Sequence, residues 1–503
     1  MDDTTNIEKI DLDKVDWRGS REFFESLGEA LDKLDDKDES YDFTWVGKRK
    51  AIIEADAPIN KTLRPDLEAS KNWDTTENLF IEGDNLDALK LLQESYLGKV
   101  KMIYIDPPYN TGKDFVYHDN FKATTADYDE DTEYKDENGN IQFKKNEKSN
   151  GRYHSDWLSM MYPRLKLARN LLADDGVIFI SIDDNEQANL KKLCDEIYSE
   201  DNLAGSFVWK TRQASGKQVA SNNISVEHEY VLAYFRSIDG RMSGVERDMS
   251  TYTNPDNDQR GIWAKHPLDV GSTRYERPNC FYDLVDPETG NVYSANPNRV
   301  WAFAPSSMQK LLEEGKIIFD PKGKNRPALK KFFNELKAEK KPVSTWFAKP
   351  NFDIEYNSNG TREVANLFNG KRYFDYPKPV SLIERLIEQG SGKESIILDF
   401  FSGSATTAQS VMQVNARDGG SRKFILIQLP EIADETTDAF KTGLRRFLKL
   451  LANAFAELVI RLLMSILMPK STTVSERSKL PTQITKKYTS LPVNINNQLC
   501  WIP

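Results

Sequence analysis

Two side chains that could do chemistry flank a pair of prolines in the stretch IYIDPPYNTG, residues 103–112. The apolar residues that open the stretch are typical of a strand buried on both faces. Proline cannot donate to a strand ladder and keeps the preceding residue extended, so this strand must end at Asp106. The stiff turn Pro107-Pro108 then fixes Asp106 relative to Tyr109 at the carboxyl end of the strand, where open α/β sheets bind ligands.

A second stretch, SIILDFFSGSATTAQSVMQ (residues 395–413), has a loop of small residues between a predicted strand and a predicted helix. The loop runs from Asp399 to Ala405 and the helix opens at Thr406, which lets the backbone approach a ligand at the helix N-terminus. Gly403 is followed by Ala405, which departs from G-x-G-x-x-G, and no lysine follows as in a phosphate-binding loop. These departures disfavour a dinucleotide or a nucleoside triphosphate as the ligand.

An acid follows the next predicted strand, because ILIQLPE ends at Glu431. An acidic side chain at this place suits hydrogen bonds to ribose hydroxyls. A loop for the amino-acid end of a ligand and an acid for its ribose together fit S-adenosylmethionine (AdoMet). Without the first motif, an ordinary strand, turn and helix with a surface glutamate would be the better interpretation.

The composition is that of a globular protein of 503 residues, long enough for two to four domains. Three scattered cysteines suit a reducing cytosol and have no metal-ligand spacing, so no metal site is expected. The acidic, polar N-terminus predicts no secretory signal. A net charge of −10 disfavours a pure nucleic-acid-binding module but allows an enzyme with a local basic cleft.

Strand and helix patterns alternate over most of the chain, which predicts an α/β fold with a parallel sheet. The alternation breaks down where short β-like runs mix with turns, and an inserted mixed α+β domain is expected there. A polar stretch from residue 114 to 150 predicts a long loop. The predicted segments are an acidic helical N-terminus (1–40), a catalytic half (41–201), the inserted domain (202–347), a ligand-binding half (348–443) and an atypical tail (444–503).

The two motifs and their order resemble the β class of amino-methylating DNA methyltransferases. IDPPYNTG is similar to the D-P-P-Y motif of that family, and LDFFSGSATTA is similar to its F-x-G-x-G AdoMet loop. The wider pattern, from IEGDNLDALKLL to NARDGGSRKFILIQLPE, resembles the modification (Mod) subunit of type III restriction-modification systems over roughly residues 40–437. The resemblance implies a Rossmann-like, AdoMet-dependent methyltransferase fold in permuted order, with an inserted target-recognition domain.

The resemblance also implies roles for individual residues. Asp106 and the carbonyl of Pro107, held by Pro108, would accept the hydrogens of a base's amino group, and Tyr109 would stack on the flipped-out base. The cofactor-binding residues would be Asp399, Phe400, Phe401, Gly403, Ala405, Thr406, Glu431, Asp84 (towards the adenine) and Lys378 (towards the methionine end). The motif usually has glycine at position 405, where we expect an allowed backbone conformation and retained binding.

Basic residues of the inserted domain are candidates for contacts to DNA phosphates or bases, because arginine reads guanine with two hydrogen bonds. They are Arg212, Arg274, Lys322, Lys324, Lys330 and Lys331, each of which alone is more often a plain surface charge. His118 and His154 lie near the catalytic loop in the sequence. Amino-methylation needs no histidine, so we interpret both as structural.

The resemblance ends near residue 444. The following stretch, FLKLLANAFAELVIRLLMSILM, is strongly apolar, but Lys449, Glu457 and Arg461 leave no span of ~20 apolar residues, so no membrane segment is expected. An amphipathic partner helix is one interpretation. Reading a back-translation of residues 447–463 one nucleotide earlier gives a sequence that resembles the family's, so we hypothesise a frameshift near Leu444. Resequencing the gene tests this hypothesis.

The function that these residues favour would be site-specific methylation of adenine N6 in duplex DNA, as the modification and recognition subunit of a type III system. Methylation of cytosine N4 has the same chemistry, although D-P-P-Y favours adenine. A catalytically weakened recognition subunit is a further alternative, which intact Asp106 and Tyr109 disfavour. The resemblance implies a homodimer, a partner restriction (Res) subunit with helicase and nuclease activity, and a location with DNA in the bacterial cytoplasm.

Overall fold

The computed structural model describes residues 42–67, 70, 73–112, 115–117, 133–135, 141–146, 148–213, 224–320, 322–336, 338, 340–367, 370–371, 374, 376–429 and 499–502. The predicted helical N-terminus, and the tail apart from residues 499–502, lie outside these residues. The chain divides into two compact units. The first comprises the described parts of Met1–Pro58, Pro108–Lys166 and Asp184–Glu200, and the second those of Ile59–Pro107, Leu167–Asp183 and Asp201–Pro503.

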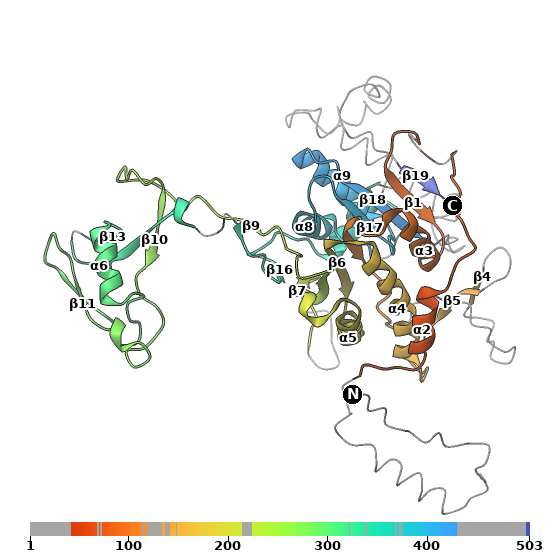
Figure 1. Ribbon diagram of the computed structural model, residues 1–503, viewed down its shortest axis with the longest axis horizontal. Coiled ribbons are helices and arrows are strands. Elements are labelled where there is room, and N and C mark those ends of the chain that lie inside the picture. The colour runs from red at the N-terminus through yellow and green to blue at the C-terminus, as the bar shows by residue number, and fades with distance from the viewer. Residues whose placement is uncertain are drawn as a thin grey trace, which may run out of the picture. The chain divides into compact units, whose positions relative to one another are not determined.

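The second unit contains a nine-stranded sheet with the order β16-β7-β8-β6-β2-β17-β18-β1-β19 (Figure 1). Neighbouring strands are parallel except at β8, which runs antiparallel to β6 and β7. The strands are β1 (Asn78–Glu82), β2 (Val100–Ile105), β6 (Leu172–Ile182), β7 (Leu203–Lys210), β8 (His228–Phe235), β16 (Trp346–Phe347), β17 (Ile396–Asp399), β18 (Lys423–Gln428) and β19 (Leu499–Ile502).

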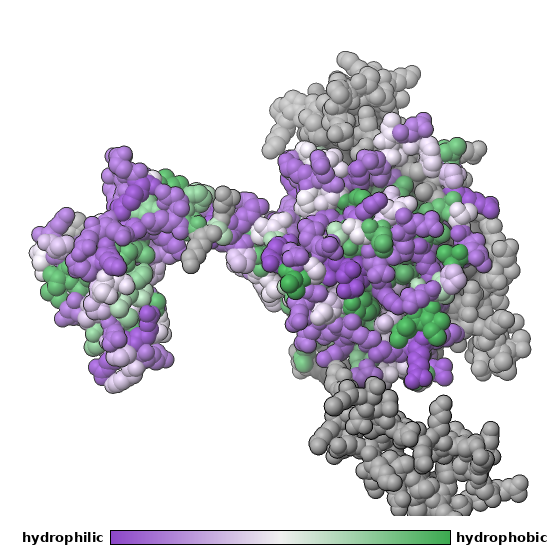
Figure 2. Space-filling model, viewed as in Figure 1, coloured by the Kyte–Doolittle hydropathy of each residue, from purple (hydrophilic) through white to green (hydrophobic). Residues whose placement is uncertain are grey.

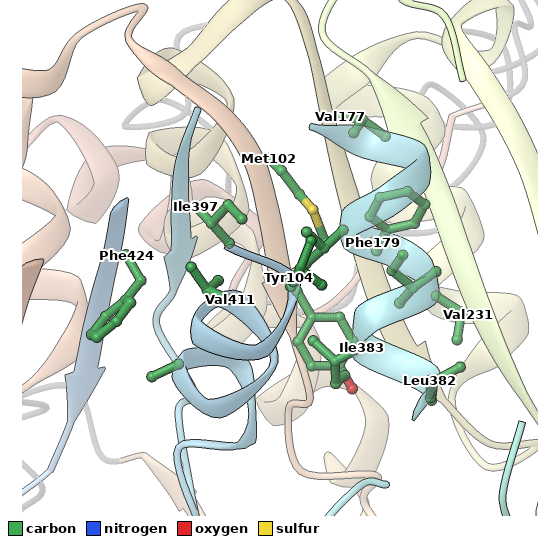
Figure 3. Close-up of a cluster of buried hydrophobic side chains, with 14 of the residues drawn as sticks. Met102, Tyr104, Val177, Phe179, Val231, Leu382, Ile383, Ile397, Val411 and Phe424 are labelled. Atoms are coloured by element: carbon green, nitrogen blue, oxygen red, sulfur yellow. The ribbon is translucent and has the colours of Figure 1, made fainter. Parts of the chain in front are cut away.

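Two helices, α8 (Val380–Gly390) and α9 (Thr406–Asp418), pack on one face of this sheet (Figure 3). An apolar cluster lies between the sheet and these helices. Alternate residues of a strand point to the same face of the sheet, so two large side chains of β2 lie in this cluster. The cluster includes Met102, Tyr104, Ile397, Leu382, Ile383 and Val411, all almost fully buried. Burial of each large apolar side chain stabilises the fold by roughly 1.5–3 kcal/mol. This burial stabilises the packing of β2 and β17 against the same two helices.

The strand order reverses between β2 and β17. From β2 the sheet continues to β6 on one side, and from β17 it continues to β18 on the other. A crevice for ligands forms at such a switch point, at the carboxyl ends of the strands. The predicted Rossmann-like α/β fold is therefore confirmed, with both motif strands side by side. Helix α3 (Asn85–Tyr96) contacts β18, and α7 (Asn357–Leu367) precedes α8 in the chain.

The first unit contains α2 (Lys48–Asp56), α5 (Gln187–Tyr198) and the larger part of α4 (Tyr153–Leu171). Its three-stranded sheet has the order β3-β5-β4. The strands are β3 (Phe115–Tyr117), β4 (Glu133–Lys135) and β5 (Ile141–Lys145). The prediction of one long loop over residues 114–150 is therefore wrong, because short antiparallel strands form within this polar stretch.

The predicted inserted domain, residues 202–347, is too wide. Strands β7 and β8 lie at its start and β16 lies at its end, yet all three belong to the nine-stranded sheet. Their aromatic, turn-flanked sequences are typical of strands but do not indicate which sheet they join. The part of the chain that builds the nine-stranded sheet therefore extends to Phe235, so the region outside this sheet is shorter than predicted.

The remainder of this region has its own small elements. A three-stranded sheet has the order β10-β14-β13, and two further strand pairs are β11–β12 and β15–β9. The elements are β9 (Val245–Glu246), β10 (Trp263–Pro267), β11 (Asp283–Val285), β12 (Val292–Ser294), α6 (Pro305–Glu313), β13 (Ile317–Ile318), β14 (Ala328–Phe332) and β15 (Lys340–Lys341). A separate apolar cluster forms around buried Trp301 and Met308, so the region has a core of its own.

Within the part of the chain that the structure describes, short 3₁₀ helices also lie at Glu200–Asn202, Pro278–Cys280 and Phe333–Glu335. Hydrophilic residues cover most of the visible face of the described chain, with apolar residues in scattered positions (Figure 2). Within the residues that the structure describes, no helix combines the length and the apolar character needed to cross a membrane.

Candidate active site

A cavity of about 370 Å³ lies in the second unit, at the carboxyl ends of β2 and β17. Strand β2 and the residue after it contribute Tyr104 and Asp106. Residues of the loop 399–407 form another wall, Gln428 at the end of β18 a third, and the segment 374–378 a fourth. The volume is within the range of sites that bind small molecules. The structure therefore brings the two motifs predicted from the sequence to a single cavity.

Asp399 ends β17 and is buried, with 2% of its surface exposed. Its carboxylate accepts hydrogen bonds from the backbone N–H of Phe401 at 3.0 Å and from the hydroxyl of Thr407 at 2.5 Å. Burial raises the pKa of Asp399 to about 7 despite these hydrogen bonds, and the nearby carboxylate of Asp106 adds to the rise. This carboxyl group therefore changes its charge near neutral pH.

Asp106 follows β2 directly, as predicted, and forms an ion pair with Lys378. The Nζ of Lys378 lies 3.0 Å from Oδ1 of Asp106 and 3.3 Å from Oε2 of Glu229, which lies on β8. Burial by itself lowers the pKa of Lys378, but the two carboxylates outweigh burial and raise it above its ordinary value. Lys378 was predicted to bind the cofactor, and the structure places it beside the predicted catalytic acid. Glu229 has no motif or spacing around it that could have identified it from the sequence.

The loop after β17 is held by hydrogen bonds from neighbouring elements. The carbonyl of Phe400, which is buried, accepts a hydrogen bond from Nδ2 of Asn85 at 2.9 Å. The N–H of Gly403 donates to Oε1 of Gln428 at 2.9 Å, and Gly403 has a φ of 46°. Phe401 lines the cavity. The small-residue loop thus lines the cavity while its neighbours Asn85 and Gln428 hold its backbone in place.

Ala405, the residue before α9, has φ 60° and ψ 30°. This is the small left-handed region of backbone space, where a Cβ costs roughly 1–2 kcal/mol. The expectation of an allowed conformation is met only in this restricted sense, because the position is one that favours glycine. Thr406 begins the helix, and its hydroxyl lies 2.9 Å from Oγ of Ser404.

Three described residues among the predicted cofactor ligands do not line the cavity, namely Phe400, Ala405 and Asp84. Asp84 caps α3, where its carboxylate accepts from the N–H groups of Leu86 at 2.9 Å and Asp87 at 3.2 Å. Glu431 lies outside the described residues. Gln428, three residues earlier, is the polar group that lines the cavity at the end of β18. Its position at the end of an apolar run was the signal that could have identified it.

Pro108 and Tyr109 belong to the first unit, where a buried polar network fixes the turn. The indole N–H of Trp157 donates to the carbonyl of Pro108 at 2.7 Å. Asn110 is fully buried with a φ of 57°, a conformation that asparagine tolerates better than most residues. Its Nδ2 donates to Oε1 of Glu186 at 2.5 Å. Neither Asn110 nor Glu186 was among the site residues predicted from the sequence.

The same network includes His154, whose Nδ1 lies 2.6 Å from Oε1 of Glu186. Asn146 donates from Nδ2 to Oδ1 of Asn110 at 2.9 Å. The structural role predicted for His154 is consistent with these contacts, whereas His118 lies outside the described residues.

The predicted DNA-binding residues have different surroundings. Arg212 donates from Nε to the carbonyl of Val226 at 2.7 Å, and the guanidinium of Arg274 lies 4.8 Å from the centre of the Tyr275 ring. Lys322 and Lys324 lie in an exposed turn, and Lys331 is half-buried on β14. Lys330 forms ion pairs with Asp256 and Asp258, so its charge is neutralised locally and it is the weakest of the six candidates.

The residues around the cavity fit AdoMet in their chemistry. The carboxyl groups of Asp106 and Asp399 suit a ligand that carries a sulfonium and an ammonium. The buried hydroxyl of Ser402, which lines the cavity, has no hydrogen-bond partner among the described residues. A ligand can satisfy such a group. Elsewhere in the described residues, no three His, Cys, Asp or Glu side chains gather in a way that could hold a metal ion.

A mainly parallel sheet, with one antiparallel strand and a cavity at its switch point, defines the class of Rossmann-like α/β proteins. Residues 100–437 match the family described as DNA methylase. The Mod subunit of the type III restriction-modification enzyme StyLTI from Salmonella typhimurium is 35% identical over 82% of this chain and 61% of its own length. The EcoP15I Mod subunit from Escherichia coli is 34% identical over 80% of this chain and 67% of its own length.

The type II methyltransferase M.KpnI from Klebsiella pneumoniae is 33% identical over 74% of this chain and 85% of its own length. The solved structure of PvuII DNA methyltransferase (cytosine-N4-specific) is 12% identical with a TM-score of 0.36, over 85% of this chain and 97% of that one. This TM-score is low, so the strand order itself carries the fold assignment. The chain belongs to the DNA methylase family, which includes these Mod subunits.

Proposed function

We propose that this protein transfers the methyl group of AdoMet to adenine N6 at specific sites in duplex DNA. The observation that carries the proposal is the meeting of Asp106 and Asp399 in a single cavity, at the carboxyl ends of adjacent parallel strands. Family membership supports the reaction class, and the names of the most similar relatives support the role of a type III modification subunit.

The proposed mechanism relies on hydrogen-bond acceptors at the end of β2. The exocyclic nitrogen of adenine is a weak nucleophile because its lone pair is delocalised into the ring. Asp106 accepts one N–H of that amino group, and the carbonyl of Pro107 accepts the other, which favours a tetrahedral nitrogen with a free lone pair. Neither the proline carbonyl nor the carboxylate is used in the strand ladder, since β2 ends at Ile105.

AdoMet, when bound, supplies an electrophilic methyl group on its sulfonium. The residues of the loop 399–407 and Gln428 hold this cofactor next to Asp106, and Tyr109 stacks on the base that has left the duplex. Catalysis then consists mainly of positioning, which contributes up to ~7–11 kcal/mol when reacting atoms are well aligned. The chain needs no covalent intermediate for this reaction.

The finer parts of the proposal concern partners and place. The relatives are named as subunits of restriction-modification enzymes, so a homodimer and a partner Res subunit are proposed for this chain as well. Target recognition is assigned to the region between β8 and β16. The bacterial cytoplasm, where DNA is accessible, is the proposed location.

The test is methyl transfer from labelled AdoMet to mixed-sequence duplex DNA, followed by nucleoside analysis. N6-methyladenine is the expected product, and N4-methylcytosine would keep the mechanism but overturn the substrate. The variant Asp106→Asn should lose methyl transfer and keep AdoMet binding, and Asp239→Asn, at an exposed position, is the matched control. AdoMet binding without any product in the wild-type protein would support the catalytically weakened recognition subunit instead.

A further inference from the structure

Lys378 is enclosed between two carboxylates. It is 8% exposed, and its Nζ lies 3.0 Å from Asp106 and 3.3 Å from Glu229. Glu229 is held in turn by Nδ2 of Asn357, which donates to its Oε1 at 2.9 Å. Each oxygen of Glu229 therefore has a different partner. One lysine, two acids and an amide form a connected set that reaches from β8 to the end of β2.

Helix α7 supplies one side of this arrangement. Asn357, Gly360 and Glu363 recur at every third residue, so they share one face of the helix. A Cβ at Gly360 would lie 2.2 Å from the carbonyl oxygen of Pro377, so only glycine permits this close approach of helix and backbone. This contact places the backbone of the Lys378 segment directly against α7.

Glu363 fixes the other end of the same segment. Its Oε2 accepts a hydrogen bond from the backbone N–H of Val380, the first residue of α8, at 3.0 Å. The face of α7 thus contacts the backbone on both sides of Lys378, at Pro377 and at Val380, and holds Glu229 at a third point. The spacing N-x-x-G-x-x-E is visible in the sequence, but its meaning depends on β8, which is far away in the chain.

We propose that Lys378 and Glu229 are positioning residues for Asp106: Lys378 keeps its carboxylate ionised, and Glu229 holds Lys378 in place. The face of α7 formed by Asn357, Gly360 and Glu363 builds their arrangement. This inference rests on the proposed methyl transfer to an amino group. As a carboxylate, Asp106 can accept an N–H on either oxygen, whereas protonation turns one oxygen into a donor and makes the group a weaker acceptor.

The charges around Asp106 explain why two positioning residues are needed. Asp399 on β17 and Tyr104 on the same strand as Asp106 also interact with it electrostatically, and the acids disfavour a second negative charge. The ammonium of Lys378 reverses that effect at short range. A lysine with a single partner would, however, bind Asp106 in competition with the substrate. Glu229 shares the lysine and leaves Asp106 able to accept from a base.

The test is the pH dependence of kcat/KM for methyl transfer in matched variants. The acid limb of this profile is the fall in kcat/KM at low pH, where Asp106 becomes protonated. Lys378→Met removes the cation, so the acid limb should move to higher pH and kcat should fall about tenfold or more. Glu229→Gln removes a negative charge near Asp106, so the acid limb should move to lower pH while kcat falls. Lys378→Arg should restore the limb. Lys423→Met, which breaks an ion pair with Glu77 at the other end of β18, is the control.

Asp399 titrates in the same pH range, so each variant is also measured in an Asp399→Asn background. A limb that moves in opposite directions for Lys378→Met and Glu229→Gln in both backgrounds supports the inference. A merely structural role would lower activity in both variants without moving the limb, which would overturn it. A weaker affinity for AdoMet in Lys378→Met, with an unmoved limb, would make Lys378 a cofactor ligand and would also overturn it.

The role of α7 is tested with Gly360→Ala, which favours the helix but forces the Pro377 carbonyl away. This variant should reproduce the shifted limb of Lys378→Met although the lysine is still present. Gly392→Ala is the matched control, since an added Cβ there meets nothing closer than 3.6 Å. Identical pH profiles for the two glycine variants, with both proteins folded, would contradict the part assigned to α7.

A readout without activity separates this inference from the proposed function. A double-mutant cycle of Asp106→Asn and Lys378→Met in urea unfolding should show a clear favourable coupling at pH 8. No coupling would overturn the ion-pair argument even in an active enzyme. If the wild-type protein binds AdoMet but methylates no DNA, the proposed function fails, and the coupling still decides whether Lys378 holds Asp106.

Discussion

A single residue, Ala405, has a backbone conformation that its side chain does not favour. Its left-handed φ and ψ precede α9 in the loop that lines the cavity. The alanine is also 3% exposed and belongs to the core between the sheet and α8 and α9. The strain of roughly 1–2 kcal/mol is therefore offset by the burial of one methyl group, which is worth about 0.8 kcal/mol.

We expect Ala405→Gly to change the free energy of unfolding by little, because the relieved strain compensates for the lost methyl contact. Ala408→Gly, one turn into α9, loses a buried methyl and adds a glycine to a helix interior, which should cost about 2 kcal/mol. Urea unfolding of both variants measures the difference. Equal losses at the two positions would show that the backbone at 405 is not strained.

The buried acid Asp399 has a consequence for stability. Its pKa is about 7 in the folded protein, mainly because of burial, and an unfolded aspartate titrates near ~3.9. Between these values the folded state keeps a proton that the unfolded state has lost, so stability falls as the pH rises. Each pKa unit corresponds to ~1.4 kcal/mol, so the fall reaches roughly 4 kcal/mol near pH 7.

Asp399→Asn should therefore flatten the decline in stability between pH 4 and pH 7, measured by urea unfolding. Asp418→Asn is the control. Burial alone would raise the pKa of Asp418, but hydrogen bonds from Arg422 lower it, so its contribution is lost only as the pH falls below about 4. A slope in Asp399→Asn equal to that of the wild-type protein would contradict the assignment.

At the scale of elements, the turn after β2 depends on its own unit for support. The indole of Trp157 holds the carbonyl of Pro108, and Asn110 is tied to Glu186. The Asn110–Glu186 contact is buried and the Trp157–Pro108 contact is partly buried. Losing either hydrogen bond would leave a polar group without its partner. The turn is therefore fixed by α4 and α5 as well as by the rigidity of its prolines.

Trp157→Phe keeps a ring in place and removes the N–H donor. We expect kcat to fall about tenfold because the turn is no longer held in position. The affinity for AdoMet, whose proposed site lies in the other unit, should be unchanged. Trp45→Phe is the matched control, since it also loses one indole hydrogen bond, to Ser159. Steady-state kinetics and AdoMet titration check this expectation, and equal kinetics in both variants would contradict it.

The elements nearest to the two motifs could be predicted from the sequence. The strand before Asp106 and the strand, loop and helix around Asp399 have local signals, namely apolar runs that end at proline or at small residues. The assignment of β8 to the main sheet could not be predicted, because a strand's sequence does not name its neighbour. The roles of Glu229 and α7 could not be predicted either, because they depend on contacts between elements that are far apart in the sequence.

At the scale of the whole molecule, the net charge is −10, and DNA binding must depend on local cations. Lys330 and Lys331 are adjacent on β14. The side chain of Lys330 forms ion pairs with two aspartates, whereas these ion pairs do not include Lys331, whose backbone lies opposite Ala264 in the strand register. Neighbouring lysines in the sequence therefore differ in the charge that they offer to a phosphate.

Lys331→Ala should weaken DNA binding and reduce the slope of log K against log salt by about 1, if this lysine contacts a phosphate. Lys330→Ala should leave the slope nearly unchanged, because its charge is already neutralised. Binding titrations over a range of salt concentrations measure both. The same slope in Lys331→Ala and wild-type protein would remove Lys331 from the predicted DNA-binding residues.

Strands β1 and β2 are adjacent in the chain but separated in the sheet by β17 and β18. Leu79 pairs with Ile425, so the first strand has no neighbour on this side until the residues of β18 have been synthesised. Pairings between such distant residues slow folding, and the exposed strand edges of an incomplete sheet promote aggregation. A ribosome must therefore release almost the whole methylase region before the central sheet can close, and until then the edges of the earlier strands stay unpaired.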